Sequence, residues 1–252
     1  MNREGKIAYL TIDDAPSDDF KEKVDFLASK KIPAVFFCEG EFLEESEEDI
    51  TYAIKKGFII GNHGYKGHPY FSNLTLEQAK EQIKKADELI DKMYEKAGIR
   101  RPAKFFRFPY GDKGGNENKQ DYKNEKPFSE EGRKKKEEIQ EFLRQLGYTH
   151  PKFKGITYKY FKPYLDDADW YWTYDCFEYS IFSKNPYFGI DSIDKVYARM
   201  DEDVPEGCRG LNYPDSEEII LLHDHDDTTK YFKLIIEKLL SKGIKFKLPE
   251  LR

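Results

Sequence analysis

The chain has 252 residues, enough for one large α/β domain or two small ones with a sizeable buried core. Its 42 basic and 48 acidic residues leave a net charge of −6, which argues against nucleic acid or anionic membranes as partners. No apolar run is long enough to span a membrane, and the three cysteines lack the close pairs of a zinc or redox motif. Because the N-terminus leads into a strand pattern without an apolar signal segment, we expect a cytoplasmic protein.

Apolar strand patterns and helical patterns alternate along the whole chain. In chain order they predict a strand at 7–12, a helix at 18–31, a strand at 34–38, a helix at 46–56, a strand at 58–60, a helix from Thr75 to Gly98, a strand at 104–108, a helix at 129–146, a strand at 169–174, a helix at 190–200, a strand at 218–222, a helix at 228–241 and a strand at 244–248. Thr75 and Gln78 form a capping box at the start of the third helix.

Repeated strand–helix units predict a parallel sheet, because right-handed crossovers place successive strands side by side. About seven strands suit a barrel better than an open sheet. No repeat or linker divides the sequence, so we expect one domain over residues 1–252. Residues 112–128 are rich in glycine, asparagine and balanced charges, which predicts a surface loop within it.

Five polar islands each follow an apolar run. They are Asp13-Asp14, Asn62 to His68, Arg107 to Tyr110, Trp172 to Asp175, and Leu221 to Asp224. In a parallel barrel the functional groups gather at the C-terminal ends of the strands, whatever their separation in sequence. The islands are therefore expected to form one site.

His63 and His68, next to the carboxylate of Asp14, match the two-histidine, one-carboxylate arrangement that holds a divalent metal. Residues five apart on a helix are rotated by about 140° from one another, so this pair needs a loop. Gly64 and Gly67 make such a loop feasible, with a positive φ expected at one of them. Alternatively, His68 caps the following segment and His63 is an ordinary hydrogen-bonded polar residue.

The order of these five motifs resembles the polysaccharide deacetylase family, the NodB-like carbohydrate esterase family 4. The resemblance runs from residue 7 to about residue 225. It implies a single-domain α/β fold, an irregular (β/α)7 TIM-like barrel of the NodB type. It also implies a carbohydrate N-deacetylase, a hydrolase that removes N-acetyl groups from an acetylated amino sugar or oligosaccharide.

The resemblance also implies residue roles. Asp14, His63 and His68 would hold a divalent metal, with Zn²⁺ the first expectation and Co²⁺, Ni²⁺ or Fe²⁺ as alternatives. Asp13 would take a proton from the attacking water. His223 would protonate the leaving amine.

Five further residues complete the expected site. The backbone N–H of Tyr110 would stabilise the oxyanion, and Leu221 would line the acetyl pocket. Arg107 would keep nearby carboxylates ionised. In the resemblance the fourth motif runs from Trp172 to Tyr179, and Glu178 and Tyr179 stand at its end as its acid and its aromatic wall.

Three features depart from the family pattern. Ala15 replaces the usual glycine after the paired acids, where a tight turn is expected. The histidines are five residues apart instead of four. The fourth motif ends in Glu178-Tyr179 instead of Asp-Trp, so the carboxylate reaches one methylene further and the aromatic wall is smaller.

Two other functions stay open from the sequence. One is a metal-independent hydrolase of an amide C–N bond on the same barrel. The other is a non-catalytic carbohydrate-binding remnant, in which the longer histidine spacing has broken the site. The sequence leaves the exact substrate and the oligomeric state undefined.

Overall fold

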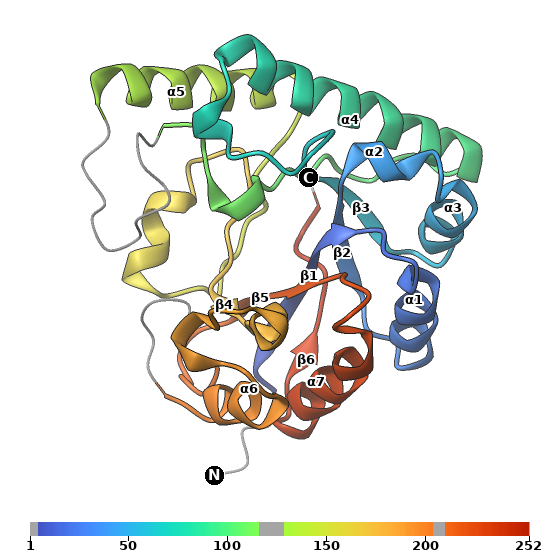
Figure 1. Ribbon diagram of the computed structural model, residues 1–252, viewed down its shortest axis with the longest axis vertical. Coiled ribbons are helices and arrows are strands. Elements are labelled where there is room, and N and C mark those ends of the chain that lie inside the picture. The colour runs from blue at the N-terminus through green and yellow to red at the C-terminus, as the bar shows by residue number, and fades with distance from the viewer. Residues whose placement is uncertain (1–4, 116–128, 204–209, 252) are drawn as a thin grey trace.

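The computed structural model describes residues 5–115, 129–203 and 210–251, in which strands and helices alternate (Figure 1). The strands are β1 (Ile7–Ala15), β2 (Ala34–Cys38), β3 (Ile59–Asn62), β4 (Tyr174–Asp175), β5 (Glu218–His223) and β6 (Lys245–Phe246). The helices are α1 (Phe20–Ser29), α2 (Gly40–Leu43), α3 (Glu47–Lys55), α4 (Leu76–Ala97), α5 (Glu130–Gln145), α6 (Ile193–Met200) and α7 (Thr229–Ser241). All the predicted helices are confirmed, with small shifts at their ends. The sequence did not predict α2, because four residues are too few to show a helical period.

Most of the surface loop expected at 112–128 lies outside the described residues, and its first residues, 112–115, are buried. That loop and the single domain over the whole chain therefore stay predictions. Among the helices that the structure describes, none is both long and apolar enough to cross a membrane.

Helix α4 begins as the sequence predicts. The Thr75 side chain accepts a hydrogen bond from the Gln78 N–H, and the Gln78 side chain accepts one from the Thr75 N–H, so both orphan donors are satisfied. The helix ends at Gly98, whose φ of +70° closes the last turn. Its apolar face is buried, which fixes α4 beside the end of β3.

The sheet is parallel, with the strand order β3-β2-β1-β5-β4 and with β6 beside the start of β1. β1 is central and pairs with β5 so that Asp13 lies opposite His223. The C-terminal ends of β1, β2, β3 and β5 consequently lie at one edge of the sheet.

The sheet continues past β3 through a segment around Phe106. The Asn62 N–H donates to the Phe105 carbonyl (2.8 Å), and the Arg107 N–H donates to the Asn62 carbonyl (3.0 Å). The prediction of a strand at 104–108 was wrong in its length. This segment forms only an isolated β-bridge, between Phe106 and Asn62. Its position in the sheet is as expected.

Residues 170–175 close the ring. The Trp170 N–H donates to the Phe106 carbonyl (2.8 Å), and the Thr173 N–H donates to the Ile219 carbonyl of β5 (3.0 Å). Of the strand predicted at 169–174, only Tyr174 belongs to a strand, β4. The fold is thus an irregular α/β barrel, as the sequence predicts, with weak pairing on the side opposite β1.

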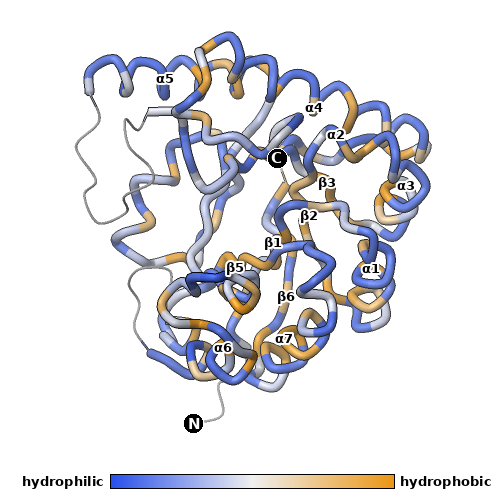
Figure 2. Tube along the Cα trace, in the orientation of Figure 1, coloured by the Kyte–Doolittle hydropathy of each residue, from blue (hydrophilic) through white to orange (hydrophobic). Residues whose placement is uncertain are grey.

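Successive side chains of β1 point to opposite faces of the strand, so the core has two layers. Ala8, Leu10 and Ile12 pack against the surrounding helices, whereas Tyr9 packs inside the barrel. The inner layer is largely aromatic and includes Val35, Phe37, Ile59, Phe105, Phe153, Trp170 and Ile219. In Figure 2 the strands are mostly orange, and the helices show blue and orange in turn along their length. Asp13 shares the inward face of β1 with Tyr9, so its carboxylate enters the barrel mouth.

Candidate metal centre and active site

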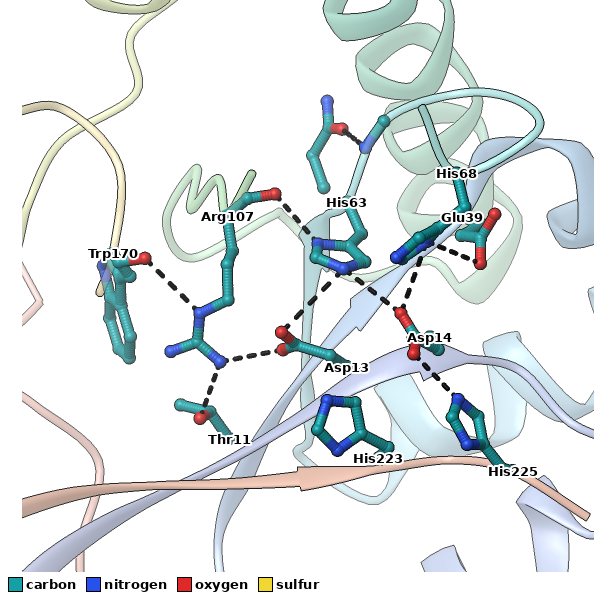
Figure 3. A network of polar contacts seen from close by, with 12 residues as sticks. Thr11, Asp13, Asp14, Glu39, His63, His68, Arg107, Trp170, His223 and His225 are labelled. Carbon is teal, nitrogen blue, oxygen red and sulfur yellow. Dashed lines mark hydrogen bonds and ion pairs between the residues drawn. The ribbon is translucent and has the colours of Figure 1, made fainter. Parts of the chain in front are cut away.

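Figure 3 shows side chains from four of the five motifs together at the barrel mouth, and the fourth motif joins them through Glu178, which contacts His223. Asp13 and Asp14 come from the end of β1, His63 follows β3, Arg107 follows the bridge at Phe106, and His223 ends β5. Parallel pairing brings these strand ends to one edge, which is the arrangement predicted from the sequence.

Asp14, His63 and His68 form a group whose ligand atoms all lie within 4.8 Å of one another. Asp14 Oδ1 is 3.2 Å from His63 Nε2 and 3.5 Å from His68 Nδ1. This oxygen is buried and has no hydrogen-bond partner among the described residues. A buried orphan oxygen between two imidazole nitrogens fits a divalent cation, which would be bound by one oxygen and two nitrogens.

The ring of His63 is oriented for such a role. Its Nδ1 lies 2.9 Å from the Arg107 carbonyl, which can only accept, so Nδ1 carries the proton and Nε2 faces Asp14. Burial alone would lower the pKa of His63, but the Asp13 and Asp14 carboxylates outweigh it and raise that pKa. These carboxylates therefore attract positive charge to this position.

Asp14 also contacts a histidine from another motif. His225, two residues beyond His223, places Nε2 2.8 Å from Asp14 Oδ2. Burial alone would raise the pKa of Asp14, but the neighbouring imidazoles of His225 and His63 hold that pKa well below its ordinary value. Asp14 is therefore ionised, as a metal ligand must be.

The backbone between the histidines bends as the sequence predicts. Gly64 and Gly67 both have positive φ, +92° and +72°, and His68 itself has φ +43°. Near the end of β1 the left-handed residue is Asp14 (φ +62°), next to Ala15, at a point where the pairing of β1 with β2 shifts its register.

Asp13 lies next to the metal group and is held by Arg107. Arg107 Nη1 donates to Asp13 Oδ1 and to Thr11 Oγ1, both at 2.8 Å. The guanidinium is fully buried and lies 4.4 Å from the centre of the Phe37 ring. Asp13 Oδ2, which is 3.8 Å from His63 Nε2, remains directed toward the metal group. The Asp13–Arg107 ion pair therefore places the Asp13 carboxylate beside the candidate metal ligands.

His223 pairs with Glu178, whose Oε1 lies 3.1 Å from His223 Nδ1. Burial alone would lower the pKa of His223, but the Glu178 carboxylate outweighs it and raises that pKa to about 10. Asp175 belongs to the same group, and burial raises its pKa to about 7. At neutral pH His223 is therefore an imidazolium that can give up a proton.

The remaining predicted residues surround this core. Tyr110 has φ +56°, is 44% exposed, and places its ring 4.6 Å from that of His68. Tyr179 packs edge-on against His223 at 4.5 Å. Leu221 is buried on β5 opposite Thr11. All three thus lie close to the groups assigned to chemistry.

The sequence reasoning missed Glu39, whose Oε1 lies 3.2 Å from His68 Nδ1. Glu39 directly follows the buried strand β2, just as Asp13 and Asp14 stand at the end of β1. A search for the first polar residue after every strand would have found it.

The family model of polysaccharide deacetylases matches residues 1–128. The chain belongs to this family. A chitooligosaccharide deacetylase of Sinorhizobium fredii is 31% identical over 104 residues, which are 41% of this chain and 46% of that protein. Seven of the curated relatives that the chain matches are covered over only 22% to 46% of their length.

Two solved structures share the fold. A family 4 carbohydrate esterase from Streptomyces lividans, in complex with acetate, has a TM-score of 0.58 and 19% identity, covering 96% of this chain and 92% of that one. A family 4 pseudoenzyme from Bacillus anthracis has a TM-score of 0.60 and 18% identity, covering 96% and 63%. At this identity both show the fold alone, and they confirm the predicted barrel type.

Proposed function

We propose that this protein is a metal-dependent N-deacetylase that hydrolyses the acetamide of an acetylated amino sugar or oligosaccharide. The observation that carries the proposal is the orphan oxygen of Asp14 between His63 and His68, directly beside the Asp13–Arg107 pair. Family membership and the chitooligosaccharide deacetylase among the relatives support a sugar acetamide as the substrate.

Asp14, His63 and His68 would hold the divalent cation, with Zn²⁺ first and Co²⁺, Ni²⁺ or Fe²⁺ as alternatives. When bound, the cation would polarise the acetamide carbonyl and acidify the attacking water. Asp13 would take the proton from this water as its oxygen adds to the carbonyl carbon. Arg107 would hold Asp13 in place through the bond to Oδ1, which leaves Oδ2 free as the base.

The reaction would end when the C–N bond breaks and acetate leaves. His223 would supply the proton to the departing amine, because the Glu178 carboxylate keeps the pKa of His223 at about 10. The Tyr110 N–H would face the developing oxyanion, and Leu221 and Tyr179 would line the space for the methyl group and the sugar.

The division of roles between adjacent acids gives the test. Zinc content is measured by elemental analysis, and acetate release is followed with an acetylated chitooligosaccharide. Asp14→Ala and His63→Ala should lose bound zinc. Asp13→Asn should keep zinc and lower kcat by roughly 10²–10⁴-fold, because only the base is removed.

The same experiment separates the alternatives. Equal zinc loss in all three variants would refute the separate roles of Asp13 and Asp14. Acetate release at full rate from zinc-free protein would favour a metal-independent amide hydrolase. Sugar binding without acetate release in the zinc-loaded wild type would favour the non-catalytic remnant.

A further inference from the structure

The two carboxylate oxygens of Asp14 have different surroundings. Oδ1 is the buried orphan oxygen, 3.2 Å from His63 Nε2 and 3.5 Å from His68 Nδ1. Oδ2 lies 2.8 Å from Nε2 of His225, which stands on the turn after β5 (Figure 3). The torsion that turns a carboxylate about its last carbon–carbon bond is soft. A contact at Oδ2 is therefore needed to hold Oδ1 between the two histidines.

We propose that His225 is a positioning residue whose Nε2–H holds Asp14 through Oδ2, so that Oδ1 stays directed at the cation; this rests on the ligand role of Asp14 under the proposed function. Carboxylates that bind a metal are themselves hydrogen-bonded, and losing such a partner costs metal affinity. The contact with His225 and the contacts with His63 and His68 use different oxygens of Asp14. The bond to His225 therefore leaves the metal-facing oxygen free.

His225 supports Asp14 as a hydrogen-bond donor, which is a different role from that of a ligand. An ionised carboxylate carries no proton and only accepts, so the proton of this hydrogen bond belongs to His225 Nε2. A protonated ring nitrogen has no lone pair to give to a cation. Among the described residues, the group whose ligand atoms lie within 4.8 Å of one another contains Asp14, His63 and His68 but not His225.

The backbone at Asp14 gives its side chain little support. The paired positions of β1 and β2 pass from Ile12 directly to Ala15, and the pairing of β1 with β5 ends at Asp13. Asp14 also has a left-handed backbone conformation (φ +62°), which a residue with a Cβ atom adopts at a cost of roughly 1–2 kcal/mol. A strained residue outside the regular strand pairing depends on side-chain contacts to keep its orientation.

The turn that carries His225 is held by buried groups. The His225 carbonyl accepts from Lys23 Nζ (3.0 Å) and from Thr228 Oγ1 (2.9 Å). Lys23, on α1, is only 1% exposed and forms a buried ion pair with Asp224, the residue before His225. The Asp224 N–H in turn donates to the Asp13 carbonyl at 2.8 Å. The base of the His225 side chain is thus fixed relative to the end of β1, independently of its contact with Asp14.

The test is the zinc affinity of the whole protein, measured by titration of metal-free protein with Zn²⁺ in competition with a chelator. His225→Phe keeps an aromatic ring and removes the donor, so it should weaken affinity by about 10–100-fold. Glutamine places an amide N–H close to the position of Nε2, so His225→Gln should retain most of the affinity. Asparagine carries the same amide on a side chain one methylene shorter, so His225→Asn should behave like His225→Phe. Asp227→Asn, which changes an exposed acid on the same turn, is the control and should leave affinity unchanged.

The comparison of glutamine with asparagine decides the outcome even if His225→Phe does not fold, because both variants replace the ring with the same polar group. Equal zinc affinity in these two variants, whether strong or weak, would overturn the inference. Affinity at the wild-type level in His225→Phe would also overturn it. Failure of the wild type to bind one zinc, or zinc retained by Asp14→Ala, would instead overturn the proposed function.

Discussion

At the scale of single residues, the pairing of His223 with Glu178 determines where the proton of the leaving group comes from. The imidazole is only 13% exposed, and this partial burial alone would favour its neutral form. The Glu178 carboxylate, 3.1 Å away, reverses this and raises the pKa of His223 to about 10. The acid form is therefore available across the neutral range.

A change at Glu178 should consequently move the alkaline limb of the pH–rate profile. We expect the kcat/KM of the wild type to fall only as pH approaches 10, and that of Glu178→Gln to fall at least about one pH unit lower. Acetate release measured between about pH 5 and pH 11 checks this. Asp194→Asn, an exposed acid on α6, serves as the control. An identical alkaline limb in Glu178→Gln would remove His223 from the role of general acid.

Much of the candidate site follows from strand ends in the sequence. Asp13, Asp14 and His63 could be predicted because each stands where an apolar run meets polar residues. The contacts of Glu39 and His225 could not, because they depend on how far the His68 loop folds back and on the turn after β5. Both are three-dimensional distances that residue spacing does not encode.

At the scale of elements, the loop between the histidines can be tested through its backbone. A Cβ atom at Gly67 would meet no atom within 4 Å, so any effect of a side chain there is conformational. Gly67→Val should destabilise the loop by roughly 1–2 kcal/mol, because a residue with a Cβ atom resists the left-handed conformation. We expect a corresponding loss of zinc affinity, measured by titration.

Gly57 provides a closely matched control for this substitution. It also has positive φ (+91°), and a Cβ atom there would likewise meet no atom within 4 Å, but it follows α3, away from the candidate metal ligands. Gly57→Val should lower the free energy of unfolding by a similar amount and leave zinc affinity intact. Unchanged zinc binding in Gly67→Val would mean that the loop tolerates the strain, and His68 should then be dropped from the ligand set.

Helices were more predictable than strands in this chain. The capping box at Thr75 and the apolar period of α4 are local signals, and the structure confirms both. The segment at 104–108 has strand-like residues, yet its place depends on partners far away in sequence. Phe105 and Phe106 are held by aromatic packing, with Trp170 and Phe71 respectively, and the backbone pairs with β3 only at a single bridge.

At the scale of the whole molecule, the buried acid Asp175 makes stability depend on pH. Burial raises the pKa of Asp175 from 3.8 to about 7. Between about pH 4 and pH 7 the unfolded chain therefore releases a proton that the folded chain keeps. The contribution of Asp175 to the free energy of unfolding is complete below about pH 4 and is lost as pH rises through 7.

Replacing Asp175 by asparagine should therefore stabilise the protein at alkaline pH. We expect Asp175→Asn to raise the free energy of unfolding at about pH 8 by about 1–3 kcal/mol, and the difference to shrink toward about pH 4. The asparagine oxygen can still accept the hydrogen bond from the Phe177 N–H, which Asp175 Oδ1 accepts at 2.8 Å. Urea unfolding at several pH values measures this. A constant difference across that range would contradict the assigned pKa.

The barrel as a whole was predictable from alternation of strands and helices and from the polar residues at the strand ends. The way in which the ring of strands closes was not predictable from these patterns. Closure uses one hydrogen bond from Trp170 to Phe106 and the short pairing of β4 with β5, and these require the aromatic interior to set the spacing between segments.

Asp14, His68, Tyr110 and Phe177, which lie in or beside the candidate site, all have left-handed backbone conformations. At roughly 1–2 kcal/mol for each residue with a Cβ atom, they jointly oppose folding by several kcal/mol. Thermal robustness and function therefore compete at these positions. A library selected for heat resistance alone would drift toward glycine there and lose the side chains of the site. Evolution of this chain toward higher temperature would have to find its gains elsewhere in the barrel.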